Sequence, residues 1–210
     1  MRSAVCAVAV VVLAGLPSSS VAQTGAFTDS RDGKTYKTVK IGKQTWMARN
    51  LDFATDSGSW CYNDSASYCA KYGRLYTWET AKAVCPDGWK LPDTSDWYML
   101  INTAGGEGLA GQKLKSKSGW IKYKGERVNA TDTYGFSALS GGFRDNTNNR
   151  FGNVGDTGYW WMASERDDNE ACSILINYYN HTDEYGSPLW IGFVGKNNGY
   201  SVRCVRDVKK

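Results

Sequence analysis

The chemistry of this sequence's cysteines depends strongly on their spacing. Five of the six cysteines follow residue 22, at positions 61, 69, 85, 172 and 204, and no two of them form a Cys-x-x-Cys pair. His181 is the one histidine of the chain, so a zinc site lacks its usual ligands, and we predict no metal centre and no cofactor. In an oxidising compartment these thiols are disulfide partners, and their odd number leaves at least one free or paired outside the domain.

Hydrolytic chemistry has no complete set of residues. A Ser-His-Asp triad would need His181 as its base, and the Gly-x-Ser-x-Gly pattern of a nucleophile elbow is missing. Adjacent acids occur at 167–168 and 183–184, where neighbouring loop carboxylates usually point apart into solvent, and no two can be placed at glycosidase separation. We therefore predict no catalytic residues, with an exported enzyme of unrecognised chemistry as the alternative.

Aromatic side chains are abundant, with nine Trp, thirteen Tyr and six Phe. Rings beside amide groups can stack on a sugar face while the amides bind its hydroxyl groups, and the same mixture forms protein-binding surfaces. The loop rings can equally pack inside the domain, and both interpretations stay open. The candidate ligand contacts in two long polar loops, 145–158 and 177–190, are Tyr178, Tyr179, His181, Tyr185, Trp190, Asn146, Asn148 and Asn149.

Two oxygen-rich runs, 145–149 and 167–170, contain residue types that bind calcium. Asn and Asp also favour turns, so solvated turns are the simpler interpretation. A calcium-dependent lectin is therefore a second alternative to a metal-free binding module.

The first residues have the layout of a secretory signal peptide. Arg2 precedes an apolar run over 4–16, and Ser20 and Ala22 form a small-x-small cleavage site. The run is shorter than the roughly 20 residues that span a bilayer, so we predict cleavage after Ala22 and no membrane span in the mature chain. Residues 1–22 hold one basic and no acidic residue, which leaves a mature net charge of +3 (24 minus 21). With the two signs mixed along the chain, we predict no nucleic-acid partner.

Local patterns predict the elements that position these side chains. Residues 23–32 are expected to be a flexible lead-in, and alternation about Gly42 predicts a hairpin over 35–48 that flanks or joins the main sheet. Helices are expected near 78–84 and 94–103, the second with the capping-box pattern of Asp93 and Asp96.

Strands are expected to dominate after residue 135. The predicted fold class is therefore α+β, with two N-terminal helices packed on a mainly antiparallel sheet that carries long loops. In an alternating strand Trp160 and Trp161 face opposite sides, so we expect one to be buried and the other outward.

Seven segments form a motif series in a fixed order: Asp32–Tyr36, Ile41–Leu51, Tyr72–Trp78, Cys85–Pro92 with Asp96-Trp97, Gly141–Arg144, Gly158–Trp161 and Ser201–Asp207. This series resembles the Fibrobacter succinogenes major paralogous domain family. The resemblance implies one domain over 33–207, exported bacterial relatives of largely undefined activity, and a C-type-lectin-like fold, distantly similar to formylglycine-generating enzymes. The reactive cysteine pair of those enzymes is missing from its expected place, and so are the Glu-Pro-Asn and Gln-Pro-Asp triplets of calcium-dependent lectins.

The resemblance to the C-type-lectin-like fold also implies a disulfide between Cys85 and Cys204. Seven residues separate Cys61 from Cys69, so the two can close a small loop without help from distant strands, and we predict a second disulfide there and an unpaired Cys172. The alternative pairs Cys172 with Cys204 across neighbouring strands, which would free Cys85.

These patterns together predict an exported, non-catalytic binding or structural module, secreted or held at the cell surface. Its expected partners are a glycan, a polysaccharide fibre or an extracellular protein, bound through surface loops. A structural envelope component with no discrete ligand is a further possibility at this point.

Overall fold

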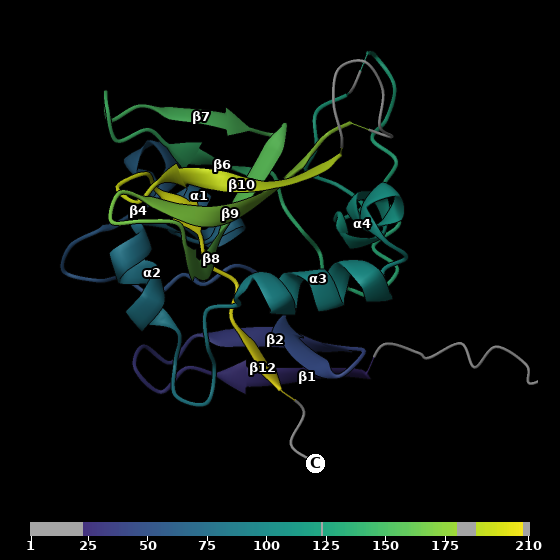
Figure 1. Ribbon diagram of the computed structural model, residues 1–210, viewed down its shortest axis with the longest axis horizontal. Coiled ribbons are helices and arrows are strands. Elements are labelled where there is room, and N and C mark those ends of the chain that lie inside the picture. Colours follow the sequence, from purple (N-terminus) through teal and green to yellow (C-terminus); the bar gives the residue numbers. More distant parts are fainter. Residues whose placement is uncertain (1–22, 123, 180–187, 208–210) are drawn as a thin grey trace, which may run out of the picture.

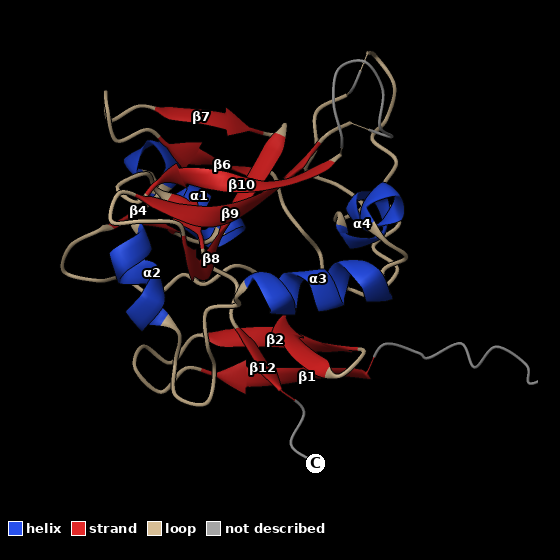
Figure 2. Ribbon diagram, in the orientation of Figure 1, coloured by secondary structure: helices blue, strands red, loops and turns tan. Residues whose placement is uncertain are grey.

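The computed structural model describes residues 23–122, 124–179 and 188–207, which form two β-sheets with four α-helices (Figures 1 and 2). The strands are β1 (Gln23–Thr28), β2 (Thr35–Ile41), β3 (Gln44–Met47), β4 (Ser59–Trp60), β5 (Leu75–Tyr76), β6 (Gly141–Arg144), β7 (Phe151–Val154), β8 (Thr157–Glu165), β9 (Glu170–Asn177), β10 (Leu189–Gly195), β11 (Tyr200–Ser201) and β12 (Val205–Asp207). The helices are η1 (Tyr62–Asp64, a 3-10 turn), α1 (Ala66–Tyr72), α2 (Trp78–Val84), α3 (Thr94–Thr103) and α4 (Glu107–Leu114). Mixed α+β composition is therefore confirmed. Over these residues no helix has the length and apolar character needed to span a membrane.

The smaller sheet has the order β1-β2-β3-β12 and is antiparallel throughout. The hairpin of β2 and β3 turns at Gly42, whose φ of 59° lies in the left-handed region that glycine tolerates. The predicted hairpin is confirmed. It does not join the larger sheet, because β2 and β3 belong to this separate sheet. The predicted flexible lead-in is also corrected, since residues 23–28 form β1 and pair with β2 along their length. β1 is mostly exposed, so it has no buried face for a sequence pattern to reveal.

The larger sheet has the order β10-β9-β8-β11-β5-β4, with β6 paired to both β7 and β8. Most of its pairs are antiparallel, and short parallel contacts join β8 to β6 and β11. β8, β9 and β10 are its long strands, and β10 lies at the edge. Figure 1 shows these strands on one side of α3 and the smaller sheet on the other.

Helix α3 packs between the two sheets, and its first turn is fixed by the predicted capping box. The Asp93 carboxylate accepts from the backbone N–H of Asp96 at 2.9 Å, and Asp96 accepts in return from the N–H of Asp93 at 3.0 Å. Asp96 is buried and also binds Gln44 Nε2 at 2.9 Å and Lys90 Nζ at 2.9 Å. The capping box therefore attaches α3 to β3, through Gln44, and to the segment that precedes α3, through Lys90.

Helices α2 and α3 lie where the sequence predicts helices, whereas α1 and α4 were not predicted. Helix α4 contains Gly108 and Gly111, and glycine is a poor helix former. A Cβ at Gly111 would lie 3.0 Å from Cβ of Pro188, so the glycine permits a close contact with the chain entering β10. The requirement for that contact comes from tertiary packing, which a local pattern does not contain.

Trp160 and Trp161 are both fully buried, so the expectation that one of them faces outward is wrong. They do point to opposite faces of β8, but each face is covered. Trp160 packs in a cluster with α3, α4 and β9, and Trp161 in a second cluster with α2, Tyr76 and Tyr200. β8 therefore has a hydrophobic core on both sides.

Both predicted disulfides are confirmed. Cys85, after α2, is bonded to Cys204, before β12, and Cys61, which precedes η1, is bonded to Cys69 in α1. Cys172 is free and buried in β9, so the alternative pairing of Cys172 with Cys204 is excluded.

The Arg203 guanidinium lies in the middle of the fold with no solvent exposure. Its Nε and Nη2 donate to Oδ1 of Asn50 at 3.0 and 2.7 Å, and its Nη1 and Nη2 donate to the carbonyls of Phe136 and Ser137. It also stacks on the Phe136 ring at 4.4 Å. Oδ1 of Asn50 accepts a further bond from Nε1 of Trp160 at 2.8 Å.

The amide nitrogen of Asn50 completes this network by donating to the carbonyl of Tyr72 at 2.8 Å and to Oγ of Ser201 at 3.2 Å. One side chain thus joins the segment after β3 to α1, β8, β11 and the segment before β12. Both Asn50 and Arg203 belong to the motif series, and in the structure their hydrogen bonds hold parts of the core together.

Replacing Asn50 by Ala is expected to lower the free energy of unfolding by about 3–5 kcal/mol, because Arg203 and Trp160 would be left buried without their acceptor. Urea denaturation followed by tryptophan fluorescence measures this change. The control Asn102→Ala, on the exposed side of α3, should change stability by less than about 0.5 kcal/mol. Equal effects of the two substitutions would contradict the assigned role of Asn50.

Candidate functional site

Three side chains form a row across one face of the larger sheet. Tyr159 on β8 pairs with Leu175 on β9, and Leu175 pairs with Trp190 on β10. Residues paired across neighbouring strands share a face, and three strands span about 10 Å. We call Tyr159, Leu175 and Trp190 the aromatic row. Tyr159 and Leu175 are half-buried, and Trp190 is 48 % exposed.

The Trp190 indole lies flat on its own strand. A Cβ built on Gly192 would be 1.7, 2.1 and 2.4 Å from Cη2, Cζ2 and Cζ3 of Trp190. Because three adjacent ring atoms lie at such similar distances from it, the Cβ position of Gly192 lies over the face of the indole and not beyond its edge. The absence of a side chain at Gly192 therefore makes the seat for the ring, and the opposite ring face is available to solvent.

Tyr159 closes the other end of the row. Its ring packs 5.2 Å from Phe143 and 5.0 Å from Tyr200, measured between ring centroids. Its hydroxyl accepts a hydrogen bond of 2.6 Å from Nδ2 of the exposed Asn153, and burial raises the pKa of the phenol. The row thus ends beside an amide group at the surface.

Tyr178 and Tyr179 follow β9 directly, at the same end of that strand as Leu175. Their ring centroids are 5.1 Å apart, and the backbone N–H of Tyr179 donates to Oδ1 of Asn177 at 3.0 Å. Burial, Tyr179 and the nearby Asp156 carboxyl raise the pKa of Tyr178, and burial raises the pKa of Asp156. The candidate site is therefore the aromatic row together with this tyrosine pair.

Lys115 lies beneath the tyrosine pair and was missed by the sequence analysis. Its side chain is fully buried, its Nζ donates to the carbonyl of Tyr179 at 2.5 Å, and it lies 5.6 Å from the Trp120 ring centroid. In the described parts of the chain no carboxylate lies within ion-pair distance of it, and burial lowers its pKa to about 8. The alternation Lys113-Leu114-Lys115 gives no signal that this lysine, and not Lys113, is buried.

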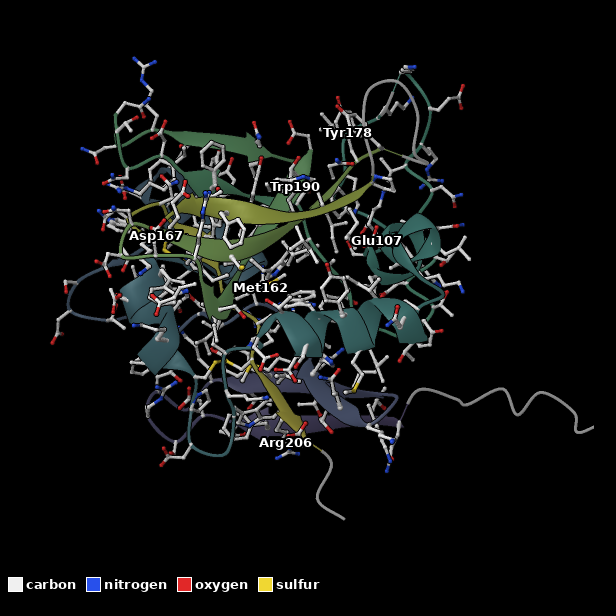
Figure 3. All side chains as sticks on the ribbon, in the orientation of Figure 1. Glu107, Met162, Asp167, Tyr178, Trp190 and Arg206 are labelled. Atoms are coloured by element: carbon white, nitrogen blue, oxygen red, sulfur yellow. A yellow bond between two sulfur atoms is a disulfide. The ribbon has the colours of Figure 1, made fainter. Side chains whose placement is uncertain are left out.

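The predicted contact residues do not form one group. Asn146, Asn148 and Asn149 lie in the turn between β6 and β7, where Asn146 N–H donates to Asn198 Oδ1 at 3.1 Å in the turn after β10. Tyr178, Tyr179 and Trp190 lie at the other end of β9, a strand about 23 Å long from its eight residues. Figure 3 shows Tyr178 and Trp190 toward one end of the sheet and Asp167, which precedes β9, at the other. His181 and Tyr185 lie outside the described residues.

The oxygen-rich runs form turns whose carboxylates are used locally. Asp145 accepts from the N–H and the hydroxyl of Thr147 at 2.8 and 2.7 Å, and Asp167 accepts from the N–H groups of Asn169 and Glu170 at 2.9 Å each. These bonds lower the pKa of both carboxyl groups, with Thr147 as the main cause for Asp145 and the Asn169 N–H for Asp167. In the described ranges no three His, Cys, Asp or Glu side chains are grouped as a metal site.

A hollow of about 700 Å³ lies at the smaller sheet. It is lined by Thr45, Gly88, Trp89, Lys90, Val205, Arg206 and Asp207. The Arg206 guanidinium lies 4.7 Å from the centroid of the Trp89 ring, and Trp89 is only 8 % exposed. Arg206 covers the Trp89 indole. A ligand in this hollow would therefore meet less exposed aromatic surface than a ligand at Trp190.

The sequence was compared with known families, curated proteins and solved structures. A model of the Fibrobacter succinogenes major domain matches residues 39–206, so the chain belongs to that family, as the motif series predicts. No curated protein and no solved structure gives a match.

Lys115 provides a test through the pH dependence of stability. Its pKa falls from 10.5 to about 8 on folding, so from pH 8 to 10.5 the unfolded chain holds more protons and stability must rise with pH. Replacing Lys115 by Met should remove this rise and stabilise the protein at pH 7 by up to about 3 kcal/mol. Urea midpoints at pH 7 and 9 measure both effects.

The matched control is Lys117→Met, which removes an exposed lysine two residues away. It should keep the pH dependence of the parent protein. A Lys115→Met variant that is less stable than the parent at pH 7, with an unchanged pH dependence, would show that Lys115 is not a buried cation under strain.

Proposed function

We propose that this protein is an exported, non-catalytic module that binds a polysaccharide through the aromatic row and the adjoining tyrosine pair. The observation that carries the proposal is the Trp190 indole, which is seated flat on Gly192 and half-exposed on an open sheet face. A ring fixed in this way loses little freedom when a ligand stacks on it.

The chemistry of the site suits a sugar chain. One face of a pyranose ring presents C–H groups that stack on an aromatic surface, while its hydroxyl groups need polar partners at the rim. Trp190 and Leu175 supply the apolar surface, and Asn153 and Tyr178 supply polar groups beside it. A row of about 10 Å is comparable in length to a disaccharide.

The buried acids support a binding role over a catalytic one. Asp29 pairs with Arg31 at 2.7 Å, Asp52 with Lys34 at 3.0 Å, and Asp96 with Lys90 at 2.9 Å, so these carboxylates hold elements together. A glycosidase needs two carboxyl groups across its substrate. Among the described residues, the acid that acts on Tyr178 is Asp156, and its raised pKa follows from burial.

Export and fold belong to the same proposal. Residues 1–22 act as a signal peptide cleaved after Ala22, and the mature protein is secreted or held at the cell surface. Two disulfides support this location, since such bonds persist in oxidising compartments. The Cys85–Cys204 bridge is the one that the resemblance implies, and it supports a C-type-lectin-like fold.

Binding of the purified oxidised protein to xylan, mixed-linkage β-glucan, cellulose and chitin tests this function. Replacing Trp190 by Ala should weaken binding to the preferred polymer tenfold to a hundredfold, equivalent to about 1.4–2.8 kcal/mol. Gly192→Ala should also weaken binding, because a Cβ there displaces the ring from its seat.

The matched control is Phe193→Ala, which removes an equally exposed ring (46 %) from the opposite face of the same strand. It should bind like the parent protein, and chelation with EDTA should leave binding unchanged. A failure of all four polymers to bind, or equal losses in Trp190→Ala and Phe193→Ala, would reject the proposed site. Loss with EDTA would favour the calcium-dependent lectin.

A further inference from the structure

Strand β10 forms the end of the larger sheet and pairs with β9 alone among the described strands. Its seven residues, Leu-Trp-Ile-Gly-Phe-Val-Gly, contain no charge and no proline. Proteins usually protect such an edge with lysines, prolines or bulges, because its unpaired backbone groups can bind another strand. Over 189–195 the sequence has none of these devices.

The hydrogen-bond register shows which backbone groups point outward. Asn177 N–H donates to the carbonyl of Pro188, and Lys196 N–H donates to the carbonyl of Asn169. In an antiparallel ladder, alternate residues bond to the partner, so the even-numbered residues of β10 bond to β9. Ile191 and Phe193 therefore direct their N–H and C=O groups away from β9, and within the described residues these groups have no hydrogen-bond partner.

The side chains beside this edge are also unusually exposed for their type. Trp190 is 48 % exposed on one face and Phe193 is 46 % exposed on the other. The Arg166 guanidinium lies 5.5 Å from the centroid of the Phe193 ring, and Arg166 is itself paired with Glu170 at 3.1 Å. An incoming strand would thus meet open backbone and apolar surface without an unpaired charge.

We propose that the occupant of this edge is β10 of a second copy, paired antiparallel about a two-fold axis at Gly192. In that register Ile191 lies opposite Phe193 of the second copy, and each such pair exchanges two backbone hydrogen bonds. The outward groups of one strand are then satisfied by the same groups of the other, which is the self-complementarity that a two-fold interface requires.

The residue on the axis favours a second copy over an unrelated strand. Gly192 would meet Gly192 of the second copy, so no Cβ atom stands at the centre and the two backbones can approach there. The Trp190 ring lies along its own strand over Gly192 and does not cover the edge. The strand is uncharged, so pairing with itself brings no like charges together.

The dimer would join two aromatic rows on one continuous sheet face. This extension rests on the proposed function, because two linked sites increase the apparent affinity for a repeating polymer without new contacts. The pairing itself is independent of any ligand and is measured without one.

Sedimentation velocity of the oxidised protein over a range of concentrations tests the pairing. We expect a reversible monomer–dimer equilibrium. Phe193→Pro removes an outward N–H and leaves the β9–β10 ladder intact, since proline is tolerated at a strand edge. It should weaken dimerisation at least tenfold. The matched variant Phe193→Thr also removes the ring but keeps the N–H, and it should still dimerise.

A monomer at every concentration would overturn the dimer, and undiminished dimerisation of both Phe193→Pro and Phe193→Thr would overturn the strand pairing at this edge. Loss in both variants would show that ring contacts, and not strand pairing, hold the copies together. Circular dichroism confirms that both variants are folded. Polysaccharide binding by the same preparations separates this inference from the proposed function, because a monomer that binds through Trp190 removes only the dimer.

Discussion

A buried arginine held by one asparagine is the interaction on which the rest of this structure depends. The Arg203 guanidinium has no carboxylate within ion-pair distance in the described residues, and burial lowers its pKa to about 9, so it stays charged at neutral pH. Asn50 and two carbonyls supply the acceptors that this cation needs. Because Asn50 also binds Trp160 and the backbone at Tyr72, the polar centre fixes how the two sheets meet.

That centre explains why the aromatic row can lie on an open face. The buried Trp160 and Trp161 anchor β8 on its two faces, so the strands beside it need not be covered to stay in place. β9 and β10 extend outward from this anchored strand, and their outer face ends at Trp190. The motif residues at the centre build the scaffold, and Tyr159 is the one residue of the candidate site that belongs to the motif series.

Local sequence patterns predicted those features whose causes are local. The capping box of Asp93 and Asp96, the turn at Gly42 and the small Cys61–Cys69 loop each involve residues close in sequence. The Cys85–Cys204 bridge, by contrast, came from the family resemblance. What could not be predicted depends on distant partners, such as the cover on both faces of β8 and the pairing of β1.

The candidate site shows the same division. Trp190 was expected to contact a ligand because of its residue type. Its position over Gly192 could be predicted only by knowing that 190–192 is a strand, where residues two apart share a face. The asparagines of 146–149 were grouped with it because both lie in polar loops, and only the length of β9 shows that they are at its opposite end. Lys115 gave no signal, since its burial comes from the fold around it.

The central claim is that Trp190, and not the buried tryptophans, meets the ligand. Nuclear magnetic resonance of the indole N–H groups tests it most directly, because each of the nine tryptophans gives one signal and a Trp190→Phe variant assigns that of Trp190. On titration with soluble xylan or β-glucan, the Trp190 signal should shift while those of Trp160 and Trp161, which donate to Asn50 and to the Tyr76 carbonyl, stay in place. A Trp190 signal that does not move when another indole signal does would contradict the account.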